Sequence, residues 1–145
     1  MSAAKPAAPI TAFAITGVVE KGDQRGRTLG IPTANVMVAR GETFPPEGVY
    51  AATVTIADGS RHRAAVSIGR RPTFYADGFE LCEAHLLDFS GDLYDQTIAV
   101  VLTHHIRGQV RFDGVDALIA QMRQDCTIVR QTLPPPTDLS APAHR

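Results

Sequence analysis

Short runs in which apolar and polar residues alternate recur along most of the chain. A period of two predicts β-strands with one buried face and one solvent-facing face. The alternating apolar positions are Phe13, Ile15 and Val19; Tyr50, Ala52, Val54 and Ile56; Ala64, Val66 and Ile68; and Ile98, Val100, Leu102 and Ile106. Turn residues separate these runs, and the pair Asp58-Gly59 predicts a hairpin between two of them. Strands at this spacing favour a small barrel or a sandwich.

The pattern changes to a helical period near residue 115. Apolar residues there fall on one stripe of a helix, at Val115, Leu118, Ile119, Met122, Cys126, Val129 and Leu133. Asp113 is expected to cap the first turn, and the three prolines after Leu133 end the helix. The sequence therefore predicts a mainly β domain followed by a C-terminal helix.

The two ends of the chain lack any such period. Residues 1–10 and 134–145 are rich in Ala and Pro, so both are expected to be disordered tails. The folded domain is expected at 11–133. A chain of 145 residues accommodates one such domain with a sizeable core.

The charge of the chain argues against a nucleic-acid or membrane partner. Its formal net charge is -1 and its basic residues are spread along the sequence, so a broad positive field is missing. Cys82 and Cys126 lie far apart without CxxC spacing, which favours buried thiols over a disulfide or a zinc site. With no secretory signal and no long apolar run, a reduced, cytoplasmic protein is expected.

A glycine-rich, basic segment, GDQRGRTLGIPTAN, is the first candidate for chemistry. Glycines let backbone N–H groups approach phosphate oxygens, and Arg25 or Arg27 can neutralise phosphate charge. Strand alternation puts Thr33 and Asn35 on one face, where a hydroxyl and an amide oxygen suit Mg²⁺ beside a nucleotide. The alternative is a turn in which Gly, Pro and Asn only shape the backbone.

The strand LCEAHLLDF carries the second candidate. Cys82, Ala84 and Leu86 share its apolar face, which leaves Glu83 and His85 together on the other face. A carboxylate on a rigid strand can accept the proton of an attacking hydroxyl, as phosphoryl transfer to an alcohol requires. The alternative is an ordinary solvated strand face.

Three aspartates lie at the end of this strand and in the turn after it, at positions 88, 92 and 95. No EF-hand spacing accompanies them, which argues against a calcium loop. They are interpreted as turn residues, because Asp side chains readily bond to nearby backbone groups.

Five segments follow one another in a specific order: GDQRGRTLGIPTAN, PEGVY, SIGRRPTF, LCEAHLLDFSGDLYDQ and IRGQVRF. In this order they resemble the ATP-dependent riboflavin kinase family, over residues 13 to 133. The resemblance implies a six-stranded antiparallel Greek-key β-barrel with a C-terminal α-helix. It also implies that Mg-ATP phosphorylates the ribityl 5′-hydroxyl of riboflavin, which gives FMN and ADP.

The resemblance implies a role for each candidate residue. Glu83 matches the catalytic base of the family, and Thr33 and Asn35 match the residues that bind magnesium and the nucleotide phosphates. The nucleotide-binding loop would contribute Gly22, Gly26, Arg27 and Gly30. The flavin-binding segment would contribute Arg107, Phe112 and Asp113. Two positions depart from the family pattern: Ile31 replaces a common aromatic residue, and Gln109 replaces a common Glu.

Two other interpretations remain open. Bacterial relatives often join this kinase to an FMN adenylyltransferase, so the chain is either a stand-alone kinase or the kinase half of such a protein. In both cases association with a separate adenylyltransferase is an expectation. The second interpretation is a flavin- or nucleotide-binding regulatory module without catalysis. The presence of Thr33, Asn35 and Glu83 together favours the enzyme.

Overall fold

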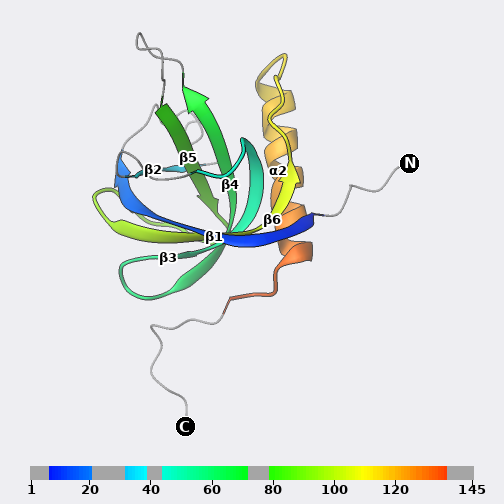
Figure 1. Cartoon of the computed structure of the whole chain (residues 1–145). Helices are drawn as coiled ribbons and strands as arrows, with labels where there is room; N and C mark the ends of the chain where they lie inside the picture. The colour runs from blue at the N-terminus through cyan, green and yellow to red at the C-terminus, as the bar shows by residue number, and fades with distance from the viewer. Residues whose placement is uncertain (1–6, 21–31, 39–43, 72–78, 137–145) are drawn as a thin grey trace.

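A computed structural model describes residues 7–20, 32–38, 44–71 and 79–136. Within these ranges the chain forms six strands and one long helix (Figure 1). The elements are β1 (Ala8–Glu20), β2 (Ala34–Met37), β3 (Gly48–Thr55), β4 (Arg61–Arg71), β5 (Phe79–Leu86), β6 (Thr97–Arg107) and α2 (Val115–Thr132). The helical segment is not long and apolar enough to cross a membrane.

The strands close into a barrel in the order β1-β2-β5-β4-β3-β6, with every neighbouring pair antiparallel. β3, β4 and β5 are consecutive neighbours, and β6 returns to lie beside β3, which is the Greek-key order. The predicted hairpin at Asp58-Gly59 joins β3 to β4. The prediction of a six-stranded antiparallel Greek-key barrel is therefore confirmed, and the sandwich alternative is excluded.

The interior of the barrel is filled by the apolar side chains that the alternation predicted. Fully or almost fully buried positions come from every strand, among them Ile15, Val19, Val36, Val54, Val66, Ile68, Cys82, Val100 and Leu102. Small residues also point inward at Ala34, Ala52, Ala64 and Ala84. A six-stranded barrel has little interior space, so this mixture of branched and small side chains fills it without a channel.

The first strand starts earlier than expected. Residues 8–10, predicted to belong to the N-terminal tail, form the beginning of β1. The register of β1 against β6 shifts between Pro9 and Phe13. Proline is tolerated in a strand at such an irregularity because no ladder hydrogen bond is needed there, which explains why the Ala- and Pro-rich composition misled the prediction.

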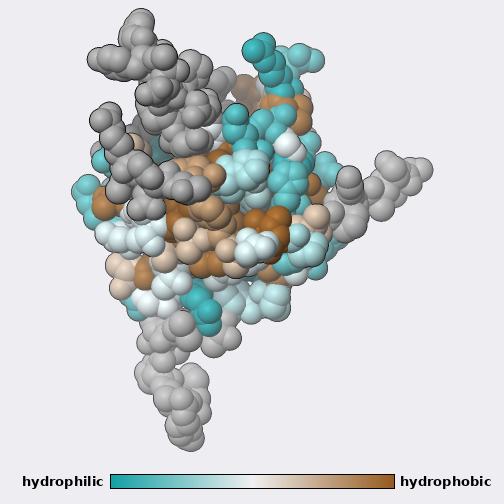
Figure 2. All heavy atoms as spheres, viewed as in Figure 1, coloured by the Kyte–Doolittle hydropathy of each residue, from teal (hydrophilic) through white to brown (hydrophobic). Residues whose placement is uncertain are grey.

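Helix α2 packs on the outside of the barrel and creates a second core. Val49, Ala51, Leu87 and Ile106 of the barrel meet Ile128 and Val129 of the helix. The predicted stripe holds for this C-terminal half, but Val115 at the other end is 37% exposed. That end of the helix projects beyond the barrel (Figure 1), and its surface is mostly hydrophilic (Figure 2).

The ends of α2 differ from one another in how they are terminated. The predicted cap at Asp113 is wrong: Gly114 occupies the N-cap position, and no side chain bonds to the first turn. The helix stops at Thr132, ahead of the proline run, as predicted. Arg63 of β4 donates to the carbonyl oxygen of Leu133 at 3.2 Å, which ties this end to the barrel.

Val129→Ala is expected to lower the free energy of unfolding by about 1–3 kcal/mol, because the side chain is fully buried in the apolar cluster between the helix and the barrel. Val115→Ala is the matched control, with an expected change within about 0.5 kcal/mol. Urea denaturation of both variants measures the difference. Equal losses would contradict the packing described for the helix.

Candidate active site

The pairing of β2 with β5 brings the predicted site residues together. Asn35 lies opposite Glu83 in the register, and directly opposed residues of an antiparallel pair share a face. The Thr33 hydroxyl donates a long hydrogen bond of 3.4 Å to Oε2 of Glu83. The carboxylate therefore points toward the Thr33 and Asn35 pair. Their chemical roles stay predictions.

The local sequence explains why these side chains face outward. Ala34 and Val36 alternate with Asn35 and are buried in the barrel, as are Cys82 and Ala84 on either side of Glu83. Since side chains alternate across a strand, the residues between them must lie on the outer face. The predicted faces of both strands are confirmed.

A hydrogen bond from β5 fixes the entry to β2. Nδ1 of His85 lies 2.7 Å from the carbonyl oxygen of Pro32. A carbonyl only accepts, so the neutral ring carries its proton on Nδ1. This bond holds the residue immediately before Thr33, and the fixed φ of proline further limits the approach of the chain.

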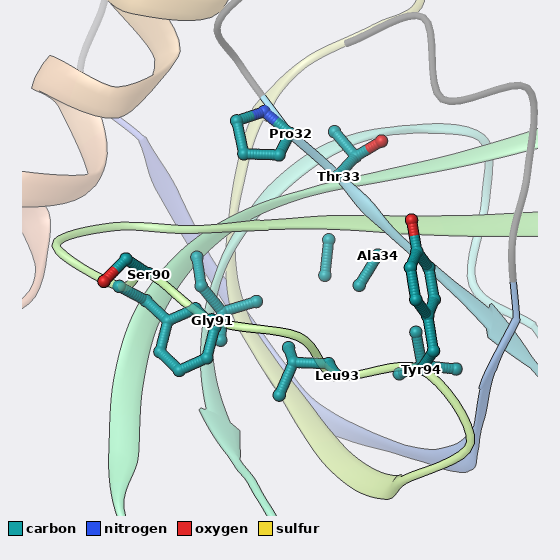
Figure 3. Close-up of a pocket in the computed structure, with 11 residues that line it drawn as sticks. Pro32, Thr33, Ala34, Ser90, Gly91, Leu93 and Tyr94 are labelled. Carbon is teal, nitrogen blue, oxygen red and sulfur yellow. The ribbon is translucent and has the colours of Figure 1, made fainter. Parts of the chain in front are cut away.

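A cavity of about 320 Å³ opens beside Thr33 at one end of the barrel. Its lining is mostly apolar, with contributions from Val19, Pro32, Thr33, Ala34, Ala84, Leu86, Phe89, Ser90, Gly91, Leu93 and Tyr94. Figure 3 shows it between the start of β2 and the loop that follows β5, with the Tyr94 hydroxyl directed toward β2. Glu83 does not line this cavity, because it lies on the outer face of β5.

The loop at 87–96 is shaped by its aspartates. Asp88 and Asp95 adopt left-handed backbone conformations, with φ of 57° and 67°. Asp92 Oδ1 accepts from the backbone N–H of Tyr94 at 2.8 Å. The backbone N–H of Asp95 donates to Val19 at 2.8 Å, which ties the loop to β1. The interpretation of these aspartates as turn residues is confirmed.

Burial keeps the nearest thiol out of the chemistry. The pKa of Cys82 is raised to about 12, first by burial in the barrel and second by the charge of Glu83. The thiol is therefore protonated near neutral pH, and it is a poor nucleophile in that form. This agrees with its interpretation as a buried core residue.

The site offers the oxygen ligands that magnesium prefers. Thr33 supplies a hydroxyl, Asn35 an amide oxygen and Glu83 a carboxylate, all hard donors. Within the described ranges, no three His, Cys, Asp or Glu side chains gather in a group able to hold a metal. The donor set therefore fits an ion that takes its remaining ligands from substrate phosphates and water.

The predicted flavin-binding residues lie in and after the end of β6. Nε and Nη2 of Arg107 donate to the two carboxylate oxygens of Asp125 at 2.9 and 2.8 Å. Gln121 donates to the same carboxylate at 3.1 Å, and the guanidinium lies 5.9 Å from the Phe112 ring centroid. Arg107 is thus engaged in holding α2 to the barrel. Asp113 is exposed, and the flavin roles of all three predicted residues stay predictions.

The predicted site and the observed site differ in both directions. Gly22, Gly26, Arg27 and Gly30, predicted to bind the nucleotide, lie outside the described residues. The cavity-lining residues from Phe89 to Tyr94 were not predicted as a site, although the DFSGDLY motif marked the loop. Asp125, only 3% exposed, was missed because it lies beside the apolar stripe of α2.

A family model described as riboflavin kinase matches residues 10–133. This chain belongs to the riboflavin kinase family. The bifunctional riboflavin kinase/FMN adenylyltransferase of Pseudomonas fluorescens is 41% identical over 123 residues, which are 85% of this chain and 39% of the relative. The chain thus spans about two fifths of the length of the curated relatives it matches.

Two solved structures share the fold of this riboflavin kinase family member. One from Streptococcus pneumoniae, described as a macrolide-efflux protein, has a TM-score of 0.75 at 35% identity, over 81% of this chain and 38% of that chain. The riboflavin kinase of Trypanosoma brucei has a TM-score of 0.62 at 24% identity, over 84% of this chain and 80% of its own. At that identity the second likeness shows the fold alone.

Asp125→Ala is expected to lower the free energy of unfolding by about 3 kcal/mol or more, because Arg107 is left without its buried partner. Arg130→Ala is the control: its pair with Asp88 is exposed, so a loss of about 0–1 kcal/mol is expected. Urea denaturation at neutral pH measures both. Similar losses in the two variants would show that the Arg107–Asp125 pair does not stabilise this kinase domain.

Proposed function

We propose that this chain transfers the γ-phosphoryl group of Mg-ATP to the ribityl 5′-hydroxyl of riboflavin, with FMN and ADP as products. One observation carries the proposal: the Glu83 carboxylate lies opposite Asn35 and faces Thr33, and Thr33 in turn lines a mostly apolar cavity. A proton acceptor and two oxygen ligands thus share one small region. Membership of the riboflavin kinase family supports the choice of substrates.

The nucleotide base fits the cavity beside Thr33. Its lining of aliphatic side chains, with Phe89 and Tyr94, suits a flat heteroaromatic group, and its volume of about 320 Å³ holds a group of that size. With the nucleotide base in the cavity, the phosphates reach Thr33 at its rim and Asn35 beyond the rim. The loop residues Gly22, Gly26, Arg27 and Gly30 are proposed to cover the phosphates.

Thr33 and Asn35 are the proposed ligands of magnesium, because their oxygens are hard donors next to the proposed phosphate position. When bound, the ion neutralises charge on the phosphates. The β2–β5 ladder fixes the backbone that carries Asn35, and the Thr33 side chain is bonded to Glu83. Less of the site therefore has to be ordered when the nucleotide binds.

Glu83 is the proposed base. The ribityl oxygen forms a bond to the γ-phosphorus, the bond from that phosphorus to the ADP oxygen breaks, and the hydroxyl proton moves to the Glu83 carboxylate. The ladder partners on both sides hold the backbone of β5, so the carboxylate starts from a fixed position on the outer face. Positioning supplies most of the rate, since phosphoryl transfer needs little covalent help from the protein.

A larger assembly is part of the proposal. The relatives in which FMN adenylyltransferase is named are more than twice as long as the part that this chain matches. We propose that an adenylyltransferase, linked or separate, takes the FMN made here. The competing function is a regulatory module that binds both ligands without turnover.

Incubation with riboflavin, ATP and MgCl₂, followed by chromatography for FMN, tests the kinase. Glu83→Gln keeps the size of the side chain and removes the base, so turnover is expected to fall by about 10²–10⁴-fold with ATP binding retained. Thr97→Ala, at an exposed position near the start of β6, is the control. Near-parental turnover of the Gln variant would exclude Glu83 as the base. Binding of both ligands by the parent protein without product would favour the regulatory module.

Asn35→Ala is expected to raise the magnesium concentration that gives half-maximal rate by about tenfold, the scale of one lost ligand or hydrogen bond to a charged group. Titration of MgCl₂ at saturating ATP and riboflavin measures it. Met37→Ala, at an exposed position of the same strand, serves as the control. An unchanged magnesium requirement would remove Asn35 from the metal site.

A further inference from the structure

Gln109 bonds to the strand next to β5, the strand that carries the proposed catalytic base Glu83. Ser67 of β4 is the register partner of Glu83, so the two side chains share the outer face. Nε2 of Gln109 donates to the Ser67 hydroxyl at 2.9 Å. Neighbouring strands are about 4.8 Å apart, so the carboxamide lies within reach of a substrate held at Glu83.

The orientation of this carboxamide is decided by its other contacts. Nε2 also donates to the carbonyl oxygen of Ile68 at 2.9 Å and, more weakly, to that of Gly48 at 3.4 Å. Both carbonyls only accept, so the NH₂ group must face them and Oε1 must face away. No donor among the described residues binds Oε1, which leaves it as an acceptor for a bound molecule.

The segment that carries Gln109 is held at a second point. Arg107, two residues earlier, is bound to Asp125 of α2 and also donates to the carbonyl oxygen of Gly108 at 3.1 Å. The carboxamide is therefore fixed between β3, β4 and the helix-bound end of β6. A fixed acceptor binds a donor with less loss of entropy than a mobile one.

We propose that Gln109 is a substrate-positioning residue for the phosphoryl acceptor. Its Nε2 holds the segment against β3 and β4, and its Oε1 accepts a hydrogen bond from a hydroxyl of the polyhydroxylated chain whose terminal hydroxyl faces Glu83. This inference rests on the proposed kinase function. It assigns to Gln109 the acceptor substrate and no contact with the nucleotide, which lies on the other side of Glu83, toward Thr33 and the cavity.

The carboxamide cannot be replaced by a carboxylate of the same size. A Glu side chain has no N–H, so at this position its oxygens would face two backbone carbonyl oxygens and be repelled. The side chain would turn away and release the segment. Gln109→Glu therefore removes the N–H donor of the side chain and keeps its size.

The experiment compares steady-state kinetics of the parent, Gln109→Glu and Gln124→Glu. Gln124 is exposed on α2, so its variant makes the same chemical change away from the site. Gln109→Glu is expected to raise KM for riboflavin about tenfold, the scale of one or two lost hydrogen bonds, with KM for ATP and the melting temperature unchanged. Ser67→Ala, which keeps both carbonyl partners, is expected to raise it about twofold.

Two results would overturn the inference: a riboflavin KM for Gln109→Glu that equals that of the parent, or a rise of both KM values together with a lower melting temperature. The second result would mean a general structural role. A binding assay, in which the quenching of riboflavin fluorescence measures binding, separates this inference from the kinase proposal. If the parent binds riboflavin in a Gln109-dependent way but makes no FMN, the positioning role stands and the kinase proposal fails. If the parent does not bind riboflavin, both fail.

Discussion

The antiparallel pairing of β2 with β5 is the interaction on which the site depends. It joins Asn35 to Glu83 in register and brings Thr33 within 3.4 Å of the same carboxylate. The alternation that sends these side chains outward also sends Ala34 and Cys82 into the core. A one-residue slip would exchange the two sets, because side chains alternate strictly along a strand. Core packing therefore fixes which side chains face the site.

The outer face of the barrel is divided between two uses. Over β3 and β4 it is covered by α2 with an apolar contact, and the buried Arg107–Asp125 pair joins the helix to the end of β6. Over β2 and β5 it carries Asn35 and Glu83. Ser67 lies between these regions, and Gln109 bridges them. The helix therefore stabilises the fold and also supports one side of the proposed site.

The sequence predicted much of this and missed what depends on non-local contacts. Alternation alone placed Thr33, Asn35 and Glu83 on outer faces, and the order of the motifs identified the barrel and its family. Alternation cannot show which strands are neighbours, so the meeting of β2 with β5 had no signal apart from the resemblance. The same limit hid Asp125, whose partner lies 18 residues away on another element, and the contacts of Gln109. The positions of the buried Asp125 carboxylate and of the Gln109 amide depend on their bonding partners, and those partners are brought close only by the fold.

Thr33 and Glu83 are fifty positions apart in the chain. The strands β2 and β5 are neighbours in the barrel although β3 and β4 lie between them in the sequence. The strands β3, β4 and β5 are neighbours in sequence order and can pair without β2, so we expect Glu83 to gain a paired strand before it meets Thr33 and Asn35. Loop-closure entropy makes such distant pairings late events in folding. We therefore expect the proposed activity to require closure of the ring. In a partly assembled barrel the proposed proton acceptor has not yet met the residues proposed to bind magnesium.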